Sequence, residues 1–195
     1  YEDGPNTLLP HLSIEKQMAN LFRIRATAKL ATGDRDGAVN DLRTLFRIRD
    51  VLGEEPTLIG YLVRAAIEQM GYDVFWQGTL DHAWTEAQLV EFQGRFGAMQ
   101  QKEALIYSFR GERLFGSITF DLVLQDPDKI LGAFDAMNEG VAPGLIRWMP
   151  SGWVRQNQAT HSLYLDRLVR GVQAVDPTHC IAPRVEWMTS GMTPV

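Results

Sequence analysis

Large apolar residues recur at spacings of three and four through most of the chain, which is typical of amphipathic α-helices. We expect the first helix to begin at Ser13, because a serine hydroxyl can cap the free amides of a first turn. It should end at Gly33, since glycine enters the left-handed conformation without steric cost. Its expected inner face consists of Leu12, Met18, Leu21, Phe22, Ala28 and Leu30.

A second helix is predicted directly after the first. Asp34 is its expected cap and Gly53 its expected end. The residues expected to face inward are Ala38, Val39, Leu42, Leu45, Phe46 and Leu52. Two helices joined by so short a Gly-Asp turn should pack antiparallel.

The third helix should start near Pro56, because proline lacks the amide that would go unpaired in a first turn. It is expected to pass Gly71 and continue to Phe75 or Trp76. Its apolar stripe is Leu58, Ile59, Leu62, Val63, Ala66, Ile67 and Met70.

The clearest helix start in the sequence is at Thr85, which can form a capping box with Gln88. Leu89, Phe92 and Phe96 follow on one face. The helical period continues from 100 to 124 and weakens at 110–113. Residues 115–124 would also suit a short strand, but no second alternating run offers a partner, so we predict helix there.

Beyond Asp126-Pro127 we expect a short helix carrying Ile130, a loop over 138–150, a long helix over 151–174 and an extended tail. The long helix should turn inward Val154, His161, Leu165, Leu168 and Val172. The predicted fold is therefore all-α, with six or seven helices in stacked antiparallel hairpins or an irregular bundle. We interpret residues 1–195 as a single helical domain, with a subdivision point near 138–150.

Composition narrows the class of protein. The chain has 195 residues, 45% of them hydrophobic, and a single cysteine, Cys180, which excludes a disulfide scaffold. No apolar run approaches 18 residues, so no membrane span is expected. The net charge of -5 argues against a nucleic-acid partner. Residues 51–100 hold two basic and seven acidic side chains, and this stretch would either attract a basic partner or form a solvated helix face.

Residues 33–39 read Gly-Asp-x-x-x-Ala-Val, which resembles the entry to the second helix of a tetratricopeptide repeat. Phe22 lies eleven residues earlier, where that family often has an aromatic side chain, and Leu42 and Leu45 fit second-helix positions. Pro56 comes later than the family places its closing proline, and no second copy follows. The resemblance covers residues 12–55 and implies a helical-hairpin module.

The whole chain also resembles a group of uncharacterised bacterial all-helical proteins. The segments that carry this likeness are 8–12 (Leu-Leu-Pro-His-Leu), 55–59 (Glu-Pro-Thr-Leu-Ile), 110–113 (Arg-Gly-Glu-Arg) and 152–158 (Gly-Trp-Val-Arg-Gln-Asn-Gln). The resemblance implies a further N-terminal region, often with an anchor or export signal, and no assigned activity. The start at Tyr1 fits this expectation and an extracytoplasmic or membrane-anchored location. A cloning boundary or proteolysis would equally explain that start, and the domain would then be cytoplasmic.

One candidate ligand site is the polar segment containing Arg110, Glu112 and Arg113. Two guanidinium groups beside a carboxylate suit an anionic ligand, because the planar guanidinium matches carboxylate and phosphate geometry. The alternative is a salt-bridge network that joins neighbouring helices.

A second candidate is the start of the last predicted helix. Trp153, Asn157, His161 and Tyr164 fall on one side of that helix, and Trp148 precedes them. Aromatic rings beside amides suit a polar small molecule or a peptide. Alternatively, these polar groups fix the neighbouring loop, and His161 is a buried, hydrogen-bonded histidine.

No catalytic signature is present: the chain lacks a Gly-rich phosphate loop, a Gly-x-Ser-x-Gly elbow and a His-Glu-x-x-His helix. His179-Cys180 is too small a set for a metal site, and we predict neither a metal nor a cofactor. We expect a helical module that binds a protein or peptide or serves as a structural subunit. The alternative is a small-ligand binder or enzyme with a pocket between residues 110–113 and 148–164.

Overall fold

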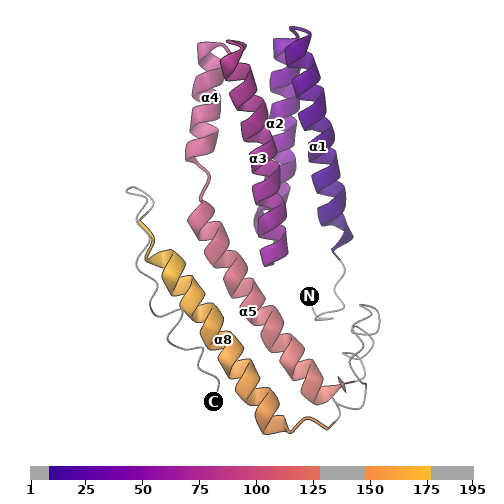
Figure 1. Cartoon of the computed structure of the whole chain (residues 1–195), viewed down its shortest axis with the longest axis vertical. Coiled ribbons are helices and arrows are strands. Elements are labelled where there is room, and N and C mark those ends of the chain that lie inside the picture. The colour runs from indigo at the N-terminus through magenta and orange to yellow at the C-terminus, as the bar shows by residue number, and fades with distance from the viewer. Residues whose placement is uncertain (1–8, 128–147, 177–195) are drawn as a thin grey trace. The chain divides into compact units, whose positions relative to one another are not determined.

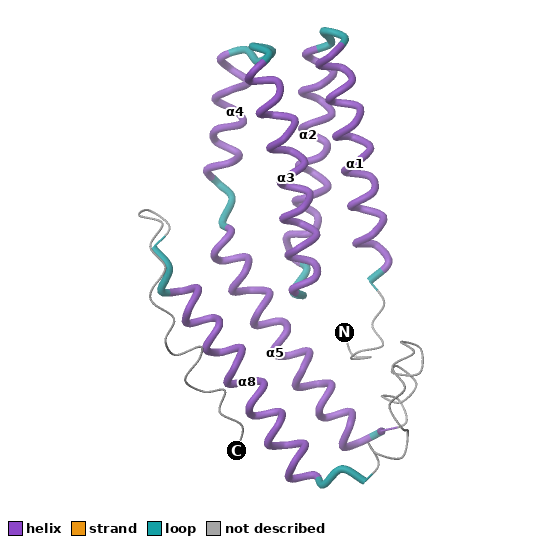
Figure 2. Tube along the Cα trace, viewed as in Figure 1, coloured by secondary structure: helices purple, strands orange, loops and turns teal. Residues whose placement is uncertain are grey.

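The structure is a computed structural model that describes residues 9–127 and 148–176 (Figure 1). Within these ranges the chain forms helices and no strand (Figure 2). The helices are α1 (Pro10–Ala31), α2 (Arg35–Val51), the 3-10 turn η2 (Leu52–Glu54), α3 (Leu58–Leu80), α4 (Glu86–Gly97), α5 (Gln101–Gln125) and α8 (Ser151–Gln173). The all-α prediction is confirmed, and residues 115–124 are helical.

The chain forms two compact units that divide between Ala104 and Leu105, inside α5. Helices α1 to α4 belong to the unit of residues 9–104, called here the N-terminal unit. The rest of α5 and α8 belong to the other, called here the C-terminal unit. The short helix expected after Asp126-Pro127, most of the 138–150 loop and the tail from 177 lie outside the described residues.

The predicted start of α1 is wrong by one turn. The helix begins at Pro10, whose ring suits a first-turn position, and Leu9 precedes it without a side-chain cap. Ser13 therefore lies inside the helix, where its hydroxyl oxygen accepts a hydrogen bond from the Gln17 amide at 3.2 Å.

The turn between α1 and α2 agrees with the prediction. Gly33 has a φ of 80°, and its N–H donates to the Leu30 carbonyl at 3.1 Å. The next amide, of Asp34, donates to the Lys29 carbonyl at 2.9 Å, which completes a Schellman motif. The Asp34 carboxylate accepts from the Gly37 N–H at 3.0 Å and so caps α2. The two helices then run side by side (Figure 1).

Replacing Asp34 with alanine should lower the free energy of unfolding by about 1 kcal/mol, because the cap of α2 is lost. Ser13→Ala is the matched control, since this hydroxyl bonds only an exposed side chain among the described contacts. Urea unfolding followed by circular dichroism measures both. Equal effects of the two substitutions would contradict the assigned caps.

The inner face of α1 also differs from the prediction. Its buried residues are Leu12, Ala19, Ala26 and Leu30, whereas Met18, Leu21 and Ala28 are exposed. The two alanines lie seven residues apart and let the neighbouring helices approach α1 closely. Sequence patterns underrate such positions because alanine is only weakly apolar.

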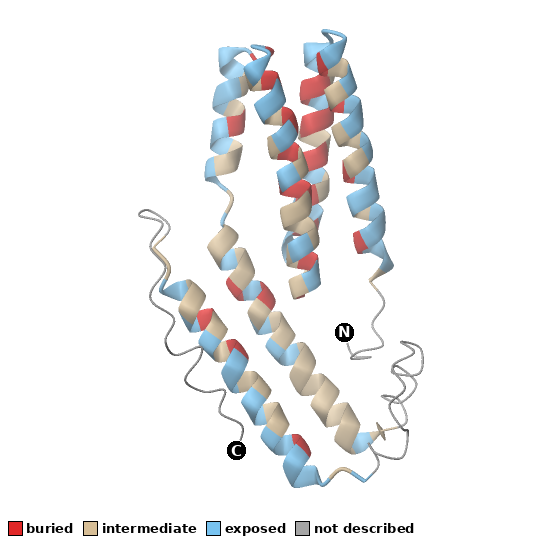
Figure 3. Cartoon of the chain, in the orientation of Figure 1, coloured by how far each residue is buried: buried red, intermediate tan, exposed pale blue. Residues whose placement is uncertain are grey.

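Helix α2 provides the centre of the N-terminal core, and all six residues predicted to face inward are buried (Figure 3). Helix α3 begins at Leu58, two residues later than the predicted proline start, because the Thr57 hydroxyl caps it by accepting from the Gly60 N–H at 3.1 Å. It crosses α2 at Gly71, where a Cβ atom would lie 2.6 Å from the Phe46 ring. Glycine at this position permits close packing.

The predicted face of α3 is wrong in part. Ile59 and Leu62 are exposed, while the buried set is Gly60, Ile67, Glu68, Gly71, Val74 and Gly78. The helix packs through its glycines, which carry no hydrophobic signal. It also extends to Leu80, beyond the expected end.

Helix α4 packs through aromatic rings. The predicted capping box of Thr85 and Gln88 is present. Phe92 is fully buried and contacts the rings of Phe46, Phe75, Trp84 and Phe96.

A bidentate ion pair also joins α4 to α2. The Arg43 Nε and Nη2 atoms donate to the Glu91 carboxylate at 2.9 and 2.6 Å. These hydrogen bonds hold the pKa of Glu91 below its ordinary value and raise that of Arg43.

Candidate functional site

The predicted site residues all lie in the C-terminal unit, on or beside α5 and α8. Helix α8 begins at Ser151, as predicted, and its buried residues are Val154, Leu165 and Val169. Val172, which was expected to face inward, is only half-buried. Besides these three buried residues, α8 uses polar side chains to contact α5.

Ion pairs and hydrogen bonds from a glutamine side-chain amide connect α5 to α8 along one flank. The Arg113 guanidinium pairs with Asp166, and the Arg155 Nη1 atom donates to Asp121 at 2.6 Å. The Gln158 amide donates to the Ser117 backbone carbonyl at 3.1 Å. A side chain of α8 that was not among the predicted site residues thus binds the backbone of α5.

The His161 imidazole ring packs directly against Gly116 of α5. A Cβ atom on Gly116 would lie 2.2 Å from the His161 Cε1 atom, so only glycine leaves room for the ring. The imidazole also lies 5.9 Å from the Phe120 ring, centre to centre. Its Nδ1 atom is buried and has no hydrogen-bond partner among the residues that the structure describes.

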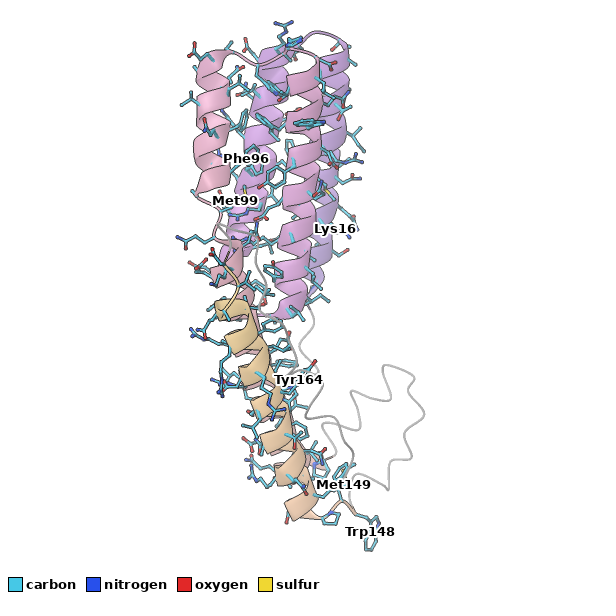
Figure 4. The ribbon with its side chains drawn as sticks, turned by 60° about the vertical axis from the view of Figure 1, so that its left-hand side comes forward. Lys16, Phe96, Met99, Trp148, Met149 and Tyr164 are labelled. Carbon is cyan, nitrogen blue, oxygen red and sulfur yellow. The ribbon has the colours of Figure 1, made fainter. Side chains whose placement is uncertain are left out.

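The other predicted aromatic residues are exposed. Trp148 precedes α8 and points away from the helix with 87% of its surface exposed (Figure 4). Trp153 and Tyr164 are about half exposed. The Asn157 amide donates to the Trp153 carbonyl at 2.9 Å, which is a bond within α8 itself.

The structure does not bring Arg113 to these aromatic rings. Its partner Asp166 comes two residues after Tyr164, and two residues turn an α-helix by about 200°. Arg113 is therefore held on the flank of α8 opposite Tyr164. Arg110 is exposed and Glu112 is half-buried. A shared pocket for 110–113 and 148–164 stays a prediction, and the pair that Arg113 makes matches the salt-bridge alternative.

Gly116→Ala should destabilise the C-terminal unit by about 1 kcal/mol, since crowding against His161 outweighs the better helix propensity of alanine. In a His161→Ala background the same change should stabilise α5. Hydrogen exchange of the α8 amides measures both effects. Gly94→Ala in α4 is the control: its Cβ would meet no atom within 4 Å, so stabilisation is expected. Loss of stability in the double variant would refute the crowding explanation.

A group of buried charged side chains lies in the N-terminal unit, and the sequence does not predict it. Glu68 of α3 is 3% exposed and pairs with the guanidinium groups of Arg49 and Arg64. The Gln101 amide also donates to its carboxylate. Burial and the charge of Arg49 lower the pKa of Arg64. The helical period of the sequence indicates neither that Glu68 is buried nor which residues it pairs with.

The sequence also missed an apolar surface row on α1. Ile14, Met18, Leu21 and Ile24 are between 45% and 61% exposed. Ile14 and Leu21 each come two residues after a buried residue, Leu12 and Ala19, so they lie on the opposite side of the helix from the core. Two of the four, Met18 and Leu21, are residues that the sequence predicts on the inner face. We call these four residues the α1 outer row.

Comparison with protein families, curated proteins and solved structures gives no match to this chain. In the described part of the chain, no helix is long and apolar enough to cross a membrane. The same residues include no group of three or more His, Cys, Asp or Glu side chains placed to hold a metal ion. His179 and Cys180 lie outside the described ranges.

Proposed function

We propose that this protein is a helical interaction module that binds another protein or a peptide. The observation that supports the proposal is the α1 outer row, in which four large apolar side chains face away from the core. Single exposed apolar residues are ordinary, but a contiguous row along three turns of one helix is typical of a contact surface.

The proposal includes an arrangement of stacked helical hairpins resembling a tetratricopeptide repeat, with six or seven helices in the whole chain. The tight Gly33 turn and the contacts of α1 with both α2 and α3 support it. In such an array the outer face of a hairpin is available to a partner.

Affinity capture from the source organism tests the proposal. The wild-type chain and an Ile14→Glu, Leu21→Glu variant would be compared by quantitative mass spectrometry. We expect at least one protein to be enriched with the wild type and lost with the variant, because a buried glutamate would be left without a partner. Leu163→Glu on α8, which is similarly exposed, is the matched control.

Light scattering on the same samples shows whether the partner is a second copy of the chain. Both glutamate variants should keep their urea midpoint, since exposed substitutions change stability little. If no protein is enriched, or if the α1 variant captures the same proteins as the wild type, the proposed function is wrong.

A further inference from the structure

A cavity of about 470 Å³ lies between α3 and α4 of the N-terminal unit, within the size range of ligand pockets. Four aromatic rings and one carboxylate contribute to its wall. The lining residues are Gln69, Tyr72, Asp73, Phe75, Trp76 and Phe96. No lysine, arginine or histidine side chain is among them.

Contacts within the protein fix the aromatic wall. The Tyr72 and Phe96 rings lie 4.6 Å apart, centre to centre, and Phe75 meets Phe96 edge-on at 5.0 Å. The Tyr72 hydroxyl donates to the Met99 sulfur at 3.4 Å. Phe96 and Met99 lie at the same end of α4 (Figure 4). A wall held in this way requires little ordering when a ligand enters.

Trp76 and Asp73 form the open edge of the cavity. Trp76 is 63% exposed and takes part in none of the ring–ring contacts of the described residues. Asp73 is exposed, and its Oδ1 atom accepts from the uncharged amide of Gln69 at 2.8 Å. In the described ranges no basic side chain forms an ion pair with Asp73.

Residues 51–100, which include both helices of the cavity, hold seven acidic and two basic side chains. The only two basic residues between 51 and 100 are Arg64, which pairs with Glu68, and Arg95, which pairs with Asp50. Arg49 of α2 also acts on Tyr72, but it is paired with Glu68 and Asp50. The Asp73 carboxylate therefore favours a positive charge at the cavity edge and disfavours an anion. A purely apolar occupant would cover the Asp73 carboxylate without compensating it, at a cost in free energy.

We infer that this cavity binds a lysine or arginine side chain from a basic segment of the partner. The negative faces of aromatic rings attract a cation, and a carboxylate at the edge adds a charge-assisted hydrogen bond. The inference rests on the proposed function and supplies the chemistry of the partner: a positively charged peptide whose side chain enters between α3 and α4.

Short capped peptides test the inference. Four would carry arginine, lysine, norleucine or glutamate at the centre of an otherwise identical uncharged sequence, with choline as a free cation. The indole N–H signal of Trp76, assigned from a Trp76→Leu variant, reports binding by NMR. We expect the arginine and lysine peptides to bind about tenfold more tightly than the norleucine peptide, and the glutamate peptide not to bind.

Two substitutions separate charge from shape. Asp73→Asn keeps the size of the side chain. It should weaken the affinity for the arginine peptide several-fold and leave the affinity for the norleucine peptide unchanged. Trp76→Leu should weaken the binding of the cationic peptides at least as much. Binding to this variant would be detected through the NMR signals of Tyr72. Tyr107→Leu, an exposed aromatic residue of α5 outside every candidate site, is the control and should change nothing.

Equal affinity for the arginine and norleucine peptides would overturn the inference, as would an unchanged affinity in Asp73→Asn or no shift at millimolar peptide. Choline binding more tightly than every peptide would assign the cavity to a free ammonium compound instead. The peptide titration uses the α3–α4 cavity alone, so the α1 double variant should retain it. If the titration fails while α1-dependent capture succeeds, the cavity inference is wrong and the interaction function stands.

Discussion

Replacing Glu68 with alanine is expected to lower the free energy of unfolding of the N-terminal unit by about 3–5 kcal/mol. The carboxylate is buried and receives the Arg49 and Arg64 guanidinium groups together with the Gln101 amide. Without it, two positive charges remain in a poorly hydrated place. Urea unfolding followed by circular dichroism measures the loss.

Two further variants identify the cause. Glu68→Gln keeps the shape and removes the charge, so it should also destabilise. Glu68→Leu combined with Arg49→Met and Arg64→Met should restore much of the stability, because a buried ionic group exchanged for apolar side chains often costs nothing. A Glu68→Ala variant within 1 kcal/mol of the wild type would show that water reaches these arginines.

The tyrosines next to the cluster offer an independent readout. Burial raises the pKa of Tyr72 above its usual value, and the negative charge of Glu68 raises it further. The pKa of Tyr61 is raised by the same two causes. In Glu68→Gln both phenols should therefore ionise at lower pH, which ultraviolet titration of tyrosinate detects.

Phe92→Ala should cost about 3–5 kcal/mol, since a large side chain is lost from a fully buried position. Phe92 is the buried residue of α4, and its ring contacts four other aromatic rings. We expect hydrogen exchange of the α4 amides to become fast while α2 stays protected. Peptide binding at the α3–α4 cavity should weaken in the same variant.

Leu89→Ala is the control for this prediction. Leu89 lies on the same helix but is 38% exposed, so its truncation should cost less than about 1 kcal/mol. Similar losses for both substitutions would mean that α4 is not held by the aromatic cluster.

The sequence predicts the caps of α2 and α4 correctly, whereas the expected starts of α1 and α3 and part of their inner faces are wrong. Asp34 and Thr85 were identified as caps because the bond they make spans only three residues. The inner face expected for α1 omits Ala19 and Ala26, yet the helix packs through both. The choice of face depends on which neighbours the helix meets, and that information is distributed over the chain.

The candidate site shows the same division. The sequence predicts a long helix that carries Trp153 and Tyr164, and both residues lie in α8. It did not indicate that Arg113 pairs with Asp166, 53 residues away, on the other flank. Glu68 and Arg49, 19 residues apart, escaped notice for the same reason. Pairing between helices depends on their rotation about their axes, which the hydrophobic period does not specify closely enough.

The small inward residues of α1 have a consequence for its local stability. Two of its four buried side chains are alanines, while its larger apolar groups face away from the core. Little apolar area therefore resists the detachment of this helix, and its amides should exchange sooner than those of α2. A partner that binds the α1 outer row only while α1 is packed would shift the equilibrium toward the packed state and raise the melting temperature. In the free protein, α1 would therefore open before α2.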